Sequence, residues 1–286
     1  MQERESYLPG VPCWLDLMQN DPEAAKEFYG GLLGWEFENA APEGSPEPYH
    51  IARLGGLNVA AIGGPHSADA LPTWNTYTAV DSVDRAVTRV RQAGGTVISE
   101  PMDVPDAGRM AVFADAEGAV FSVWEAGAFI GAQVVNEPGT WNFSELHTGD
   151  PQAAARFYGS VFNWDVLDFG VGSSAYTFFR LAGYGAFLAK GNPEFAERIA
   201  ADEGAAAFAD VVATLVDESS EQAVANPPRW TVTFAVNDAD AIAAEAERLG
   251  GKVIVPPFDS EPVRMTVLAD PQGALFTASK FQPRES

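Results

Sequence analysis

The sequence predicts an α+β protein of two tandem domains, each built from two β-α-β-β-β units with curved mixed sheets and outer helices. Three observations predict this class: landmark residues that repeat along the chain, strand and helix patterns that recur in one order four times, and a globular composition. Of 286 residues, 47% are hydrophobic and 20% are charged, which is enough apolar material for the cores of about two domains.

An internal repeat divides the chain into two copies. Asp21, which precedes a proline, recurs as Asp150, and the Phe-Tyr and Gly-Trp pairs that follow recur as Phe-Tyr and Asn-Trp at the same offset of 129 residues. Matched landmarks at a constant offset indicate duplication. We therefore expect an N-terminal domain over 8–126, a linker over 127–138 and a C-terminal domain over 139–283.

The second copy is the longer one. The offset between matching residues grows from 127 at Arg53 and Arg180 to 156 at Ala79 and Ala235. An insertion must therefore lie between these landmarks in the second copy. We place it at about 191–228, where alanine and acidic residues favour one or two surface helices.

The first unit of copy one begins with a strand over 13–18. Asp21 then offers an N-cap, with proline at the first helical position, for a helix over 23–33 that Gly34 ends. Apolar side chains recur on one face of that helix at helical spacing. Short strands are expected over 35–38, 49–53 and 58–62.

The second unit follows the same plan. A strand over 74–79 leads through a cap at Ser82 to a helix over 83–93, which ends at a Gly-Gly pair. A turn that begins at Asp115 joins the last two strands. Strands are expected over 97–99, 110–114 and 120–125.

Charge and composition exclude several classes of partner. The 17 Lys and Arg residues against 40 Asp and Glu give a net charge of −23, which repels nucleic acid and anionic lipid. The sequence contains no apolar run long enough for a membrane span and no N-terminal secretion signal, so we expect a cytoplasmic protein. We expect a monomer or a homodimer.

Few side chains can bind a metal ion. Cys13 is the single cysteine, so neither an internal disulfide nor a thiolate zinc site is expected. Of the three histidines, His50 and His66 fall in loop-like segments and are expected at the surface. The third, His147, lies on a predicted strand.

The repeated motifs resemble those of the vicinal oxygen chelate superfamily, which includes glyoxalase I, bleomycin-resistance proteins and extradiol dioxygenases. The resemblance lies in the strand-Asp-Pro-helix-Phe-Tyr-x₃-Leu-Gly-Trp pattern of 13–35 and the Asp-x-x-Gly-x-x-Phe pattern of 115–121, with counterparts at 142–164 and 270–276. It extends to two-domain bacterial proteins described as glyoxalase-like or as hydroxylases. It implies that two units enclose a ligand cavity in each domain.

The resemblance also implies positions for metal ligands, which this chain fills with other residue types. The first-strand ligand of the family lies fourteen residues before the Phe of the Phe-Tyr pair. Imidazole, carboxylate and thiolate groups hold first-row metals, and indole or phenyl rings cannot replace them. We therefore expect no bound metal. The corresponding positions are Trp14, about Asn75 and Ser122 in the first copy, and Phe143, about Thr231 and Thr277 in the second.

The side chains expected to line the two cavities are aromatic and polar. Alternation along a strand puts every second residue on one face, and a mostly apolar surface with a few polar groups suits a small molecule. The candidate ligand-binding residues are Trp14, Asp16, Asn75, Tyr77, Ser122, Trp124, Phe143, Thr231 and Thr277.

Glu145 and His147 are the candidate catalytic residues. They lie two apart on one strand, so both can face the same cavity, and a carboxylate beside an imidazole can transfer protons or orient a ligand. The alternative interpretation is a solvated strand end. The first copy has Asp16 and a methionine at these positions.

These observations lead to three hypotheses of function. The preferred one is a glyoxalase- or bleomycin-resistance-like protein that binds a small, partly aromatic metabolite in its barrel cavities without a cofactor. The first alternative is an enzyme of the superfamily, a lyase, an isomerase or a dioxygenase- or hydroxylase-type oxidoreductase, in which Glu145 and His147 could hold Fe, Zn, Ni or Mn. The second alternative is a scaffold for a protein partner.

Overall fold

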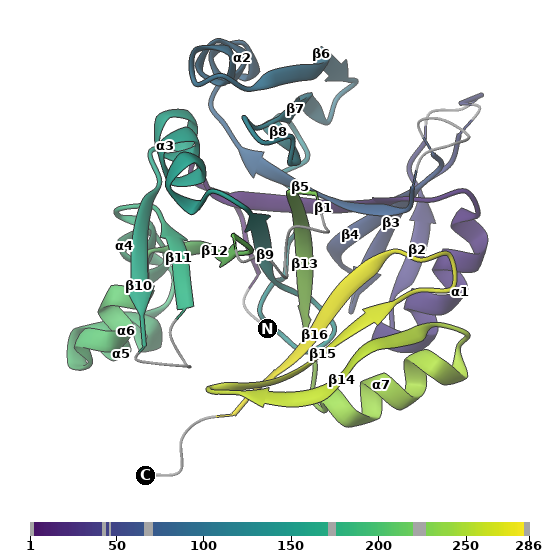
Figure 1. Ribbon diagram of the computed structural model, residues 1–286. Coiled ribbons are helices and arrows are strands. Elements are labelled where there is room, and N and C mark those ends of the chain that lie inside the picture. The colour runs from purple at the N-terminus through teal and green to yellow at the C-terminus, as the bar shows by residue number, and fades with distance from the viewer. Residues whose placement is uncertain are drawn as a thin grey trace.

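The computed structural model describes residues 3–41, 44–45, 47–65, 71–170, 176–219 and 227–282, and Figure 1 shows its ribbon. Among these residues, no helix is both long enough and apolar enough to cross a membrane.

The N-terminal domain contains two β-α-β-β-β units, as the sequence predicts. The first holds β1 (Pro12–Met18), α1 (Pro22–Leu33), β2 (Glu36–Asn39), β3 (Tyr49–Leu54) and β4 (Leu57–Gly63). The second holds β5 (Thr73–Ala79), α2 (Val83–Gln92), β6 (Thr96–Val104), β7 (Gly108–Ala114) and β8 (Val120–Ala126).

The C-terminal domain repeats this order and adds three helices to its first unit. That unit holds β9 (Trp141–Thr148), α3 (Pro151–Phe162), β10 (Asp165–Phe169), β11 (Tyr176–Arg180), α4 (Tyr184–Lys190), α5 (Pro193–Ala201), α6 (Glu203–Phe208) and β12 (Val211–Asp217). The last unit holds β13 (Arg229–Ala235), α7 (Ala239–Arg248), β14 (Lys252–Ser260), β15 (Val263–Ala269) and β16 (Leu275–Phe281).

Each domain forms one mixed eight-stranded sheet. The strand orders are β2-β3-β4-β1-β5-β8-β7-β6 and β10-β11-β12-β9-β13-β16-β15-β14, so the two sheets have the same topology. In each domain the first strands of the two units pair antiparallel at the centre, and each also pairs in parallel with the last strand of its own unit. The predicted α+β class with four units in two domains is confirmed, with open sheets rather than closed barrels.

Asp-Pro dipeptides start the first helix of each domain. The Asp21 side chain accepts a hydrogen bond from the backbone N–H of Ala24, and the Asp150 side chain does the same at Ala153. Left-handed C-caps end both helices, at Gly34 (φ 75°) and at Asn163 (φ 61°). An asparagine replaces glycine in the second copy because it tolerates this conformation.

The helices of the two domains pack against each other. Helix α1 contacts α7 and α2 contacts α3, and Figure 1 shows the ribbon of each helix. The two larger hydrophobic cores each combine mainly one unit from each domain. Tyr158 of α3 donates a hydrogen bond to Asp115 Oδ2 (2.9 Å) and accepts one from Trp230 Nε1 (2.9 Å). The oxygen Asp115 Oδ1 accepts three backbone N–H bonds in its own turn. The motif aspartate therefore joins a hairpin of one domain to a helix of the other.

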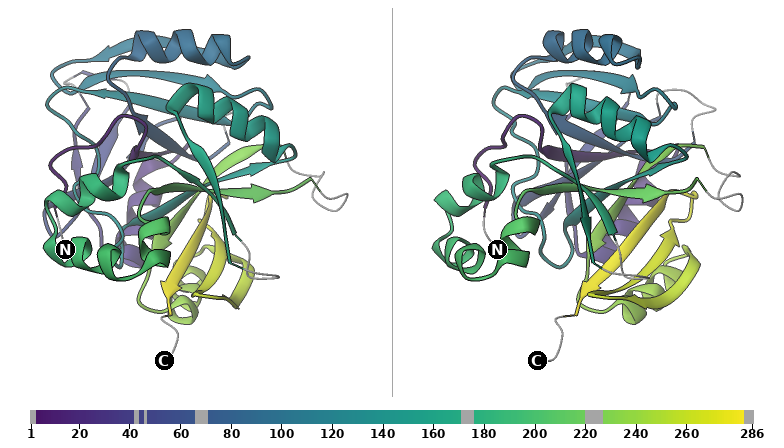
Figure 2. Two further views of the ribbon diagram at one scale, coloured as in Figure 1. Left: turned by 90° about the vertical axis from the view of Figure 1, so that its left-hand side faces the viewer. Right: turned by 60° about the vertical axis from the view of Figure 1, so that its left-hand side comes forward.

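The insertion in the second copy lies earlier than the repeat spacing predicted. Helices α4 to α6 occupy 184–208 between β11 and β12, where the first copy has the tight Gly55-Gly56 turn. The predicted range of 191–228 was wrong because it included β12, an apolar strand that pairs with both β9 and β11. The three helices form a group at the edge of the molecule (Figure 2).

Two histidines, His50 and His66, lie outside the candidate site. His50 lies in β3 and is 7% exposed, so the expected surface position was wrong. Its Nε2 lies 3.2 Å from Glu23 Oε1, and burial lowers the pKa of its imidazole. His66 lies outside the described residues.

Candidate functional site

Sheet register brings three side chains together at the centre of the N-terminal sheet. Trp14 on β1 pairs with Tyr77 on β5, and Tyr77 pairs with Ser122 on β8. Residues directly opposite each other point to the same face of a sheet. Tyr77, rather than the predicted Asn75, is therefore the second-unit partner of Trp14.

The C-terminal sheet repeats the arrangement. Phe143 on β9 pairs with Thr233 on β13, and Thr233 pairs with Thr277 on β16. Thr233 rather than the predicted Thr231 is the register partner here. Both predictions were two residues too early along the strand, which keeps the side chain on the same face.

The three paired residues at the centre of each sheet are here named its register set, and neither register set has the chemistry of a first-row metal site. An indole, a phenol and a hydroxyl meet in one domain, and a phenyl ring and two hydroxyls meet in the other, in place of imidazole or carboxylate groups. Within the described ranges, no group of three or more His, Cys, Asp or Glu side chains is arranged to hold a metal ion. The residues present therefore do not fit the metal that the family resemblance implies.

A buried carboxylate lies on the face of the N-terminal sheet to which Trp14 and Tyr77 point, here named the N-terminal concave face. Asp16 is 1% exposed and accepts hydrogen bonds from Tyr77 Oη (2.7 Å), Asn75 Nδ2 (2.8 Å) and Tyr49 Oη (3.2 Å). Burial, and after it the charge of Asp16, raises the pKa of both tyrosines well above 10.0. The predicted residues Asp16, Asn75 and Tyr77 thus form one network within the sheet.

The linker covers this concave face. Phe129 packs edge-on against Trp14 (4.8 Å between ring centroids) and against Trp124 (6.0 Å), whose Nε1 donates to Phe129 O (2.7 Å). The N-terminal arm adds a hydrogen bond from Tyr7 Oη to Ala132 O (2.7 Å). Trp14 and Trp124 are consequently buried.

The equivalent face of the C-terminal sheet, to which Phe143 and Thr233 point, is here named the C-terminal concave face. It is the more accessible of the two. The side chains of Glu145 and His147 are 18% and 16% exposed, and Phe143 and Thr231 are half-buried. The structure thus places both candidate catalytic residues on one face of β9, together with two of the candidate ligand-binding residues. Thr277 lies further across the same face and is buried.

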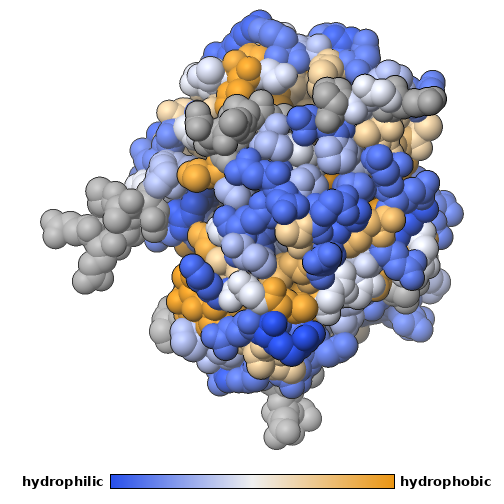
Figure 3. All heavy atoms as spheres, turned by 90° about the vertical axis from the view of Figure 1, so that its right-hand side faces the viewer, coloured by the Kyte–Doolittle hydropathy of each residue, from blue (hydrophilic) through white to orange (hydrophobic). Residues whose placement is uncertain are grey.

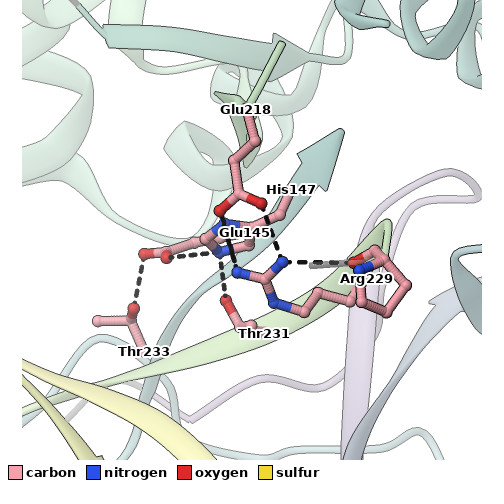
Figure 4. A network of polar contacts seen from close by, with 7 residues as sticks. Glu145, His147, Glu218, Arg229, Thr231 and Thr233 are labelled. Carbon is pink, nitrogen blue, oxygen red and sulfur yellow. Dashed lines mark hydrogen bonds and ion pairs between the residues drawn. The ribbon is translucent and has the colours of Figure 1, made fainter. Parts of the chain in front are cut away.

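His147 is bound on both ring nitrogens (Figure 4). Its Nδ1 lies 2.7 Å from Glu218 Oε1, and its Nε2 lies 3.0 Å from Thr231 Oγ1 and 3.9 Å from Glu145 Oε2. Arg229 donates to both carboxylate oxygens of Glu218, at 2.9 and 3.0 Å, and its Nη2 lies 3.3 Å from His147 Nδ1. Four side chains therefore fix the position of one imidazole.

The charge of Glu218 is stabilised by its partners. Burial alone would raise the pKa of this carboxyl, but hydrogen bonds from Arg229 and His147 outweigh burial and hold the pKa below 4.5. The two carboxylates lie at different nitrogens of His147, and a guanidinium lies beside one of them. A cation would have to displace Arg229 to share Glu218, so this network fits an ion pair rather than a metal site.

Glu218, Arg229 and Thr233 were not among the predicted site residues. Glu218 follows β12, which the repeat spacing had assigned to the insertion. Arg229 lies two residues before Thr231 on β13 and pairs with His147 across the sheet, so strand alternation could have identified it.

Aromatic side chains gather beside this network. Phe208 of α6 contacts Phe143 (6.2 Å between centroids), Phe178 (5.1 Å) and Phe169 (5.8 Å), and Tyr176 stacks on Phe178 (5.9 Å). The inserted helices thus provide one wall of the concave face.

Strands β11 and β14, which lie near opposite edges of the C-terminal sheet, contact each other at one point. Tyr176 Oη on β11 donates a hydrogen bond to the carbonyl oxygen of Ser260 on β14 (3.0 Å). The two units of this domain therefore contact each other across the concave face.

Two grooves lie elsewhere on the surface. The larger, of about 350 Å³, runs between α1, α7 and the linker, and the smaller, of about 270 Å³, lies beside β16. Neither is lined by a predicted site residue. The face in Figure 3 is mainly hydrophilic, with hydrophobic residues in separate patches.

Comparison with known proteins agrees with the fold and the repeat. The profile of the glyoxalase/bleomycin resistance protein/dioxygenase superfamily matches residues 13–123, and that of the glyoxalase-like domain matches 144–279. The chain is 38% identical to "Putative glyoxylase CFP32" of Mycobacterium tuberculosis over the whole of both chains. It is 34% identical to the anthracycline biosynthesis protein DnrV of Streptomyces peucetius over 96% of this chain and 95% of that protein.

Solved structures are similar in fold at low sequence identity. An Mn(II)-bound glyoxalase from Novosphingobium aromaticivorans superposes with a TM-score of 0.59 at 16% identity, over 95% of this chain and 82% of that chain. An extradiol ring-cleaving dioxygenase from B. fuscum gives 0.60 at 12% identity, over 99% and 75%. On the sequence identity to full-length relatives, together with the repeated motifs and the topology of both sheets, this chain belongs to the glyoxalase/bleomycin resistance protein/dioxygenase superfamily.

Proposed function

We propose that this protein binds a small, partly aromatic molecule on the concave face of its C-terminal domain, without a metal ion. The observation that carries the proposal is the group of rings around Phe208, which lies beside the half-buried Glu145 and His147. A ligand site combines an apolar surface with a few polar groups that fix orientation.

The spacing of the sheet sets the size of the ligand. Phe178 pairs with Thr214 on β12, and Thr214 pairs with Glu145, so one strand separates the ring from the carboxylate. Neighbouring strands lie about 4.8 Å apart, which puts the backbones of the two residues about 10 Å apart. A planar molecule of one to three fused rings spans this distance.

The C-terminal face is favoured over its N-terminal counterpart by exposure. Phe143 is half-buried, whereas Trp14, the residue at the equivalent position, is 3% exposed beneath Phe129. Asp16 is satisfied by three donors within its own sheet. A ligand would have to displace the linker to enter the N-terminal face.

Metal-free binding is supported by the donor groups. The register set of Phe143, Thr233 and Thr277 offers two hydroxyls, and the carboxylate of Glu218 is engaged by Arg229. The name of the relative DnrV refers to anthracycline biosynthesis, and anthracyclines contain fused aromatic rings. That chemistry agrees with a site that stacks planar rings.

Calorimetric titration with phenol, 2-naphthol and 1-hydroxyanthraquinone, with a chelator present, tests the proposal. We expect saturable binding that is about three- to tenfold weaker in Phe143→Leu, since an aromatic pair contributes about 0.5–1.5 kcal/mol beyond its buried area. Trp14→Leu is the matched control at the equivalent N-terminal position and should bind as the wild type does. The proposal fails if no probe binds, or if the control loses affinity to the same extent.

A further inference from the structure

The hydrogen bonds of His147 determine which of its nitrogens carries the proton. Glu218 is an acceptor at Oε1, 2.7 Å from Nδ1, because the two donor bonds from Arg229 keep its carboxyl ionised. An ionised carboxylate has no proton to give. Arg229 Nη2, a donor, also lies 3.3 Å from Nδ1, but the 2.7 Å contact with Glu218 is the shorter and stronger of the two. His147 therefore donates from Nδ1 to Glu218, and in the neutral ring Nε2 holds the lone pair.

The nitrogen Nε2 is directed at the concave face. Thr231 Oγ1 lies 3.0 Å from Nε2, and Thr231 pairs with Glu145 across β9 and β13, so both share the face of the proposed ligand site. A hydroxyl that donates to Nε2 is an exchangeable partner, since a substrate C–H directed at Nε2 can take its place.

Two carboxylates flank the ring on opposite sides. Glu218 lies at Nδ1, and Glu145 Oε2 lies 3.9 Å from Nε2, where Thr233 holds the other oxygen of Glu145 at 2.7 Å. Glu218 thus orients the ring through Nδ1, while Glu145 lies beside the nitrogen that faces the proposed ligand site. A histidine with one fixed tautomer, and with its unprotonated nitrogen directed at the ligand face, has the properties of a general base.

We propose that His147 is a metal-independent general base for a carbon acid, with Glu218 as the residue that positions it. The inference rests on the proposed function, because the rings around Phe208 would hold the substrate beside Nε2. The substrate class is a planar aromatic ketone with a C–H next to its carbonyl. An imidazole is too weak a base for an unactivated C–H, and the register positions offer no Lewis acid, so the substrate must carry its own electron-withdrawing carbonyl.

The reaction is a proton transfer without oxidation or reduction. The C–H bond breaks, its electron pair enters the carbonyl to form an enolate, and the proton moves to Nε2 of His147. Reprotonation at the same carbon returns the starting ketone, and reprotonation at a conjugated carbon gives an isomer. In both cases the proton leaves Nε2 and the neutral imidazole is restored.

Deuterium exchange into 2-tetralone tests this chemistry. The full-length protein is incubated with 2-tetralone in D₂O with a chelator, and incorporation is followed by mass spectrometry above the rate in buffer. We expect exchange in the wild type, none above buffer in His147→Ala, and a rate at least about tenfold lower in Glu218→Gln, since a general base contributes roughly 10²–10⁴-fold. Glu197→Gln, an exposed change on α5, is the matched control and should exchange at the wild-type rate.

Two further readouts distinguish positioning from a merely structural role. ¹⁵N NMR of histidine-labelled protein should show His147 as the Nδ1–H tautomer in the wild type and a mixture of tautomers in Glu218→Gln. Glu218→Asp should restore part of the rate.

The outcomes separate this inference from the proposed function. If 2-tetralone binds with the sensitivity to Phe143→Leu described above but exchange does not exceed that in buffer, the catalytic inference is overturned and the binding function stands. Exchange that persists in His147→Ala overturns it as well. If none of the aromatic probes binds, the proposed function fails first.

Discussion

The hydroxyl of Tyr158 donates a hydrogen bond of 2.9 Å to Asp115, although the two residues belong to different domains. Tyr29 of the N-terminal domain donates the equivalent bond, of 3.2 Å, to Asp270 of the C-terminal domain. The Phe-Tyr and Asp-x-x-Gly motifs therefore have a structural role: each copy completes the core of the other.

Replacement of this tyrosine should destabilise both domains together. Tyr158→Phe leaves Asp115 and Trp230 Nε1 each without one buried partner, and such a loss costs about 1–3 kcal/mol of unfolding free energy. Urea denaturation measures the change. Tyr29→Phe should show a loss of similar size, and wild-type stability in both variants would contradict this role for the motif.

The Glu218 network should make stability depend on pH. The folded-state pKa of Glu218 lies below its usual value of 4.5, so its contribution is present above 4.5 and is lost as the pH falls through the folded-state pKa. The gap in unfolding free energy between the wild type and Glu218→Gln should therefore be largest near neutral pH and should shrink below 4.5. Denaturation at several pH values measures it, and a gap independent of pH would show that the carboxylate charge contributes nothing.

Truncation of Phe129 should open the N-terminal concave face. Phe129→Ala removes a ring that contacts Trp14 and Trp124 and should lower the unfolding free energy by about 1–3 kcal/mol, less than for a fully buried ring. Quenching of tryptophan fluorescence by acrylamide should increase. Affinity for 2-naphthol should stay unchanged. A loss of affinity would indicate that the ligand binds in the N-terminal domain, which contradicts the proposed site.

Phe208 should matter for binding more than for stability. Helix α6 has no fully buried residue, so Phe208→Ala is expected to cost little unfolding free energy. Affinity for 2-naphthol should fall about three- to tenfold because the ring contacts Phe143 and Phe178. Phe195→Ala on α5 serves as the control. An equal loss of affinity in both variants would contradict a specific contribution of Phe208 to the ligand site.

Added metal should leave the protein unchanged. A ligand at 100 times its Kd stabilises the folded state by about 2.7 kcal/mol, which a thermal scan detects readily. We expect no increase in Tm with Mn²⁺, Zn²⁺, Ni²⁺ or Fe²⁺, and no loss of aromatic binding after chelation. Elemental analysis that finds a stoichiometric metal, lost in His147→Ala, would contradict the metal-free proposal.

The sequence predicted the local structure well because local signals specify it. Asp21 and Asp150 start helices through their own side chains, and alternation on β9 put Glu145 and His147 on one face. The absence of imidazole or carboxylate groups at Trp14 and Phe143 was equally readable, since it depends only on spacing within one unit. The order of helices and strands along the chain followed from the repeat.

Contacts between distant units could not be predicted in this way. The pairing of Phe143 with Thr233 joins two strands that a whole unit separates, so no turn fixes their register, and the prediction was two residues off. The boundary of the insertion was missed because β12 has its partners, β9 and β11, only in the folded sheet.

By itself, then, the amino-acid order determined the units, their caps and the residue types along each strand, because these depend on neighbours within a few positions. Only the tertiary structure decided that Phe129 covers one concave face while Phe208 borders the other, and that Glu218 and Arg229 meet His147. The physical reason is that these side chains arrive from a linker, an inserted helix and separate strands, whose paths through space are set by packing rather than by spacing.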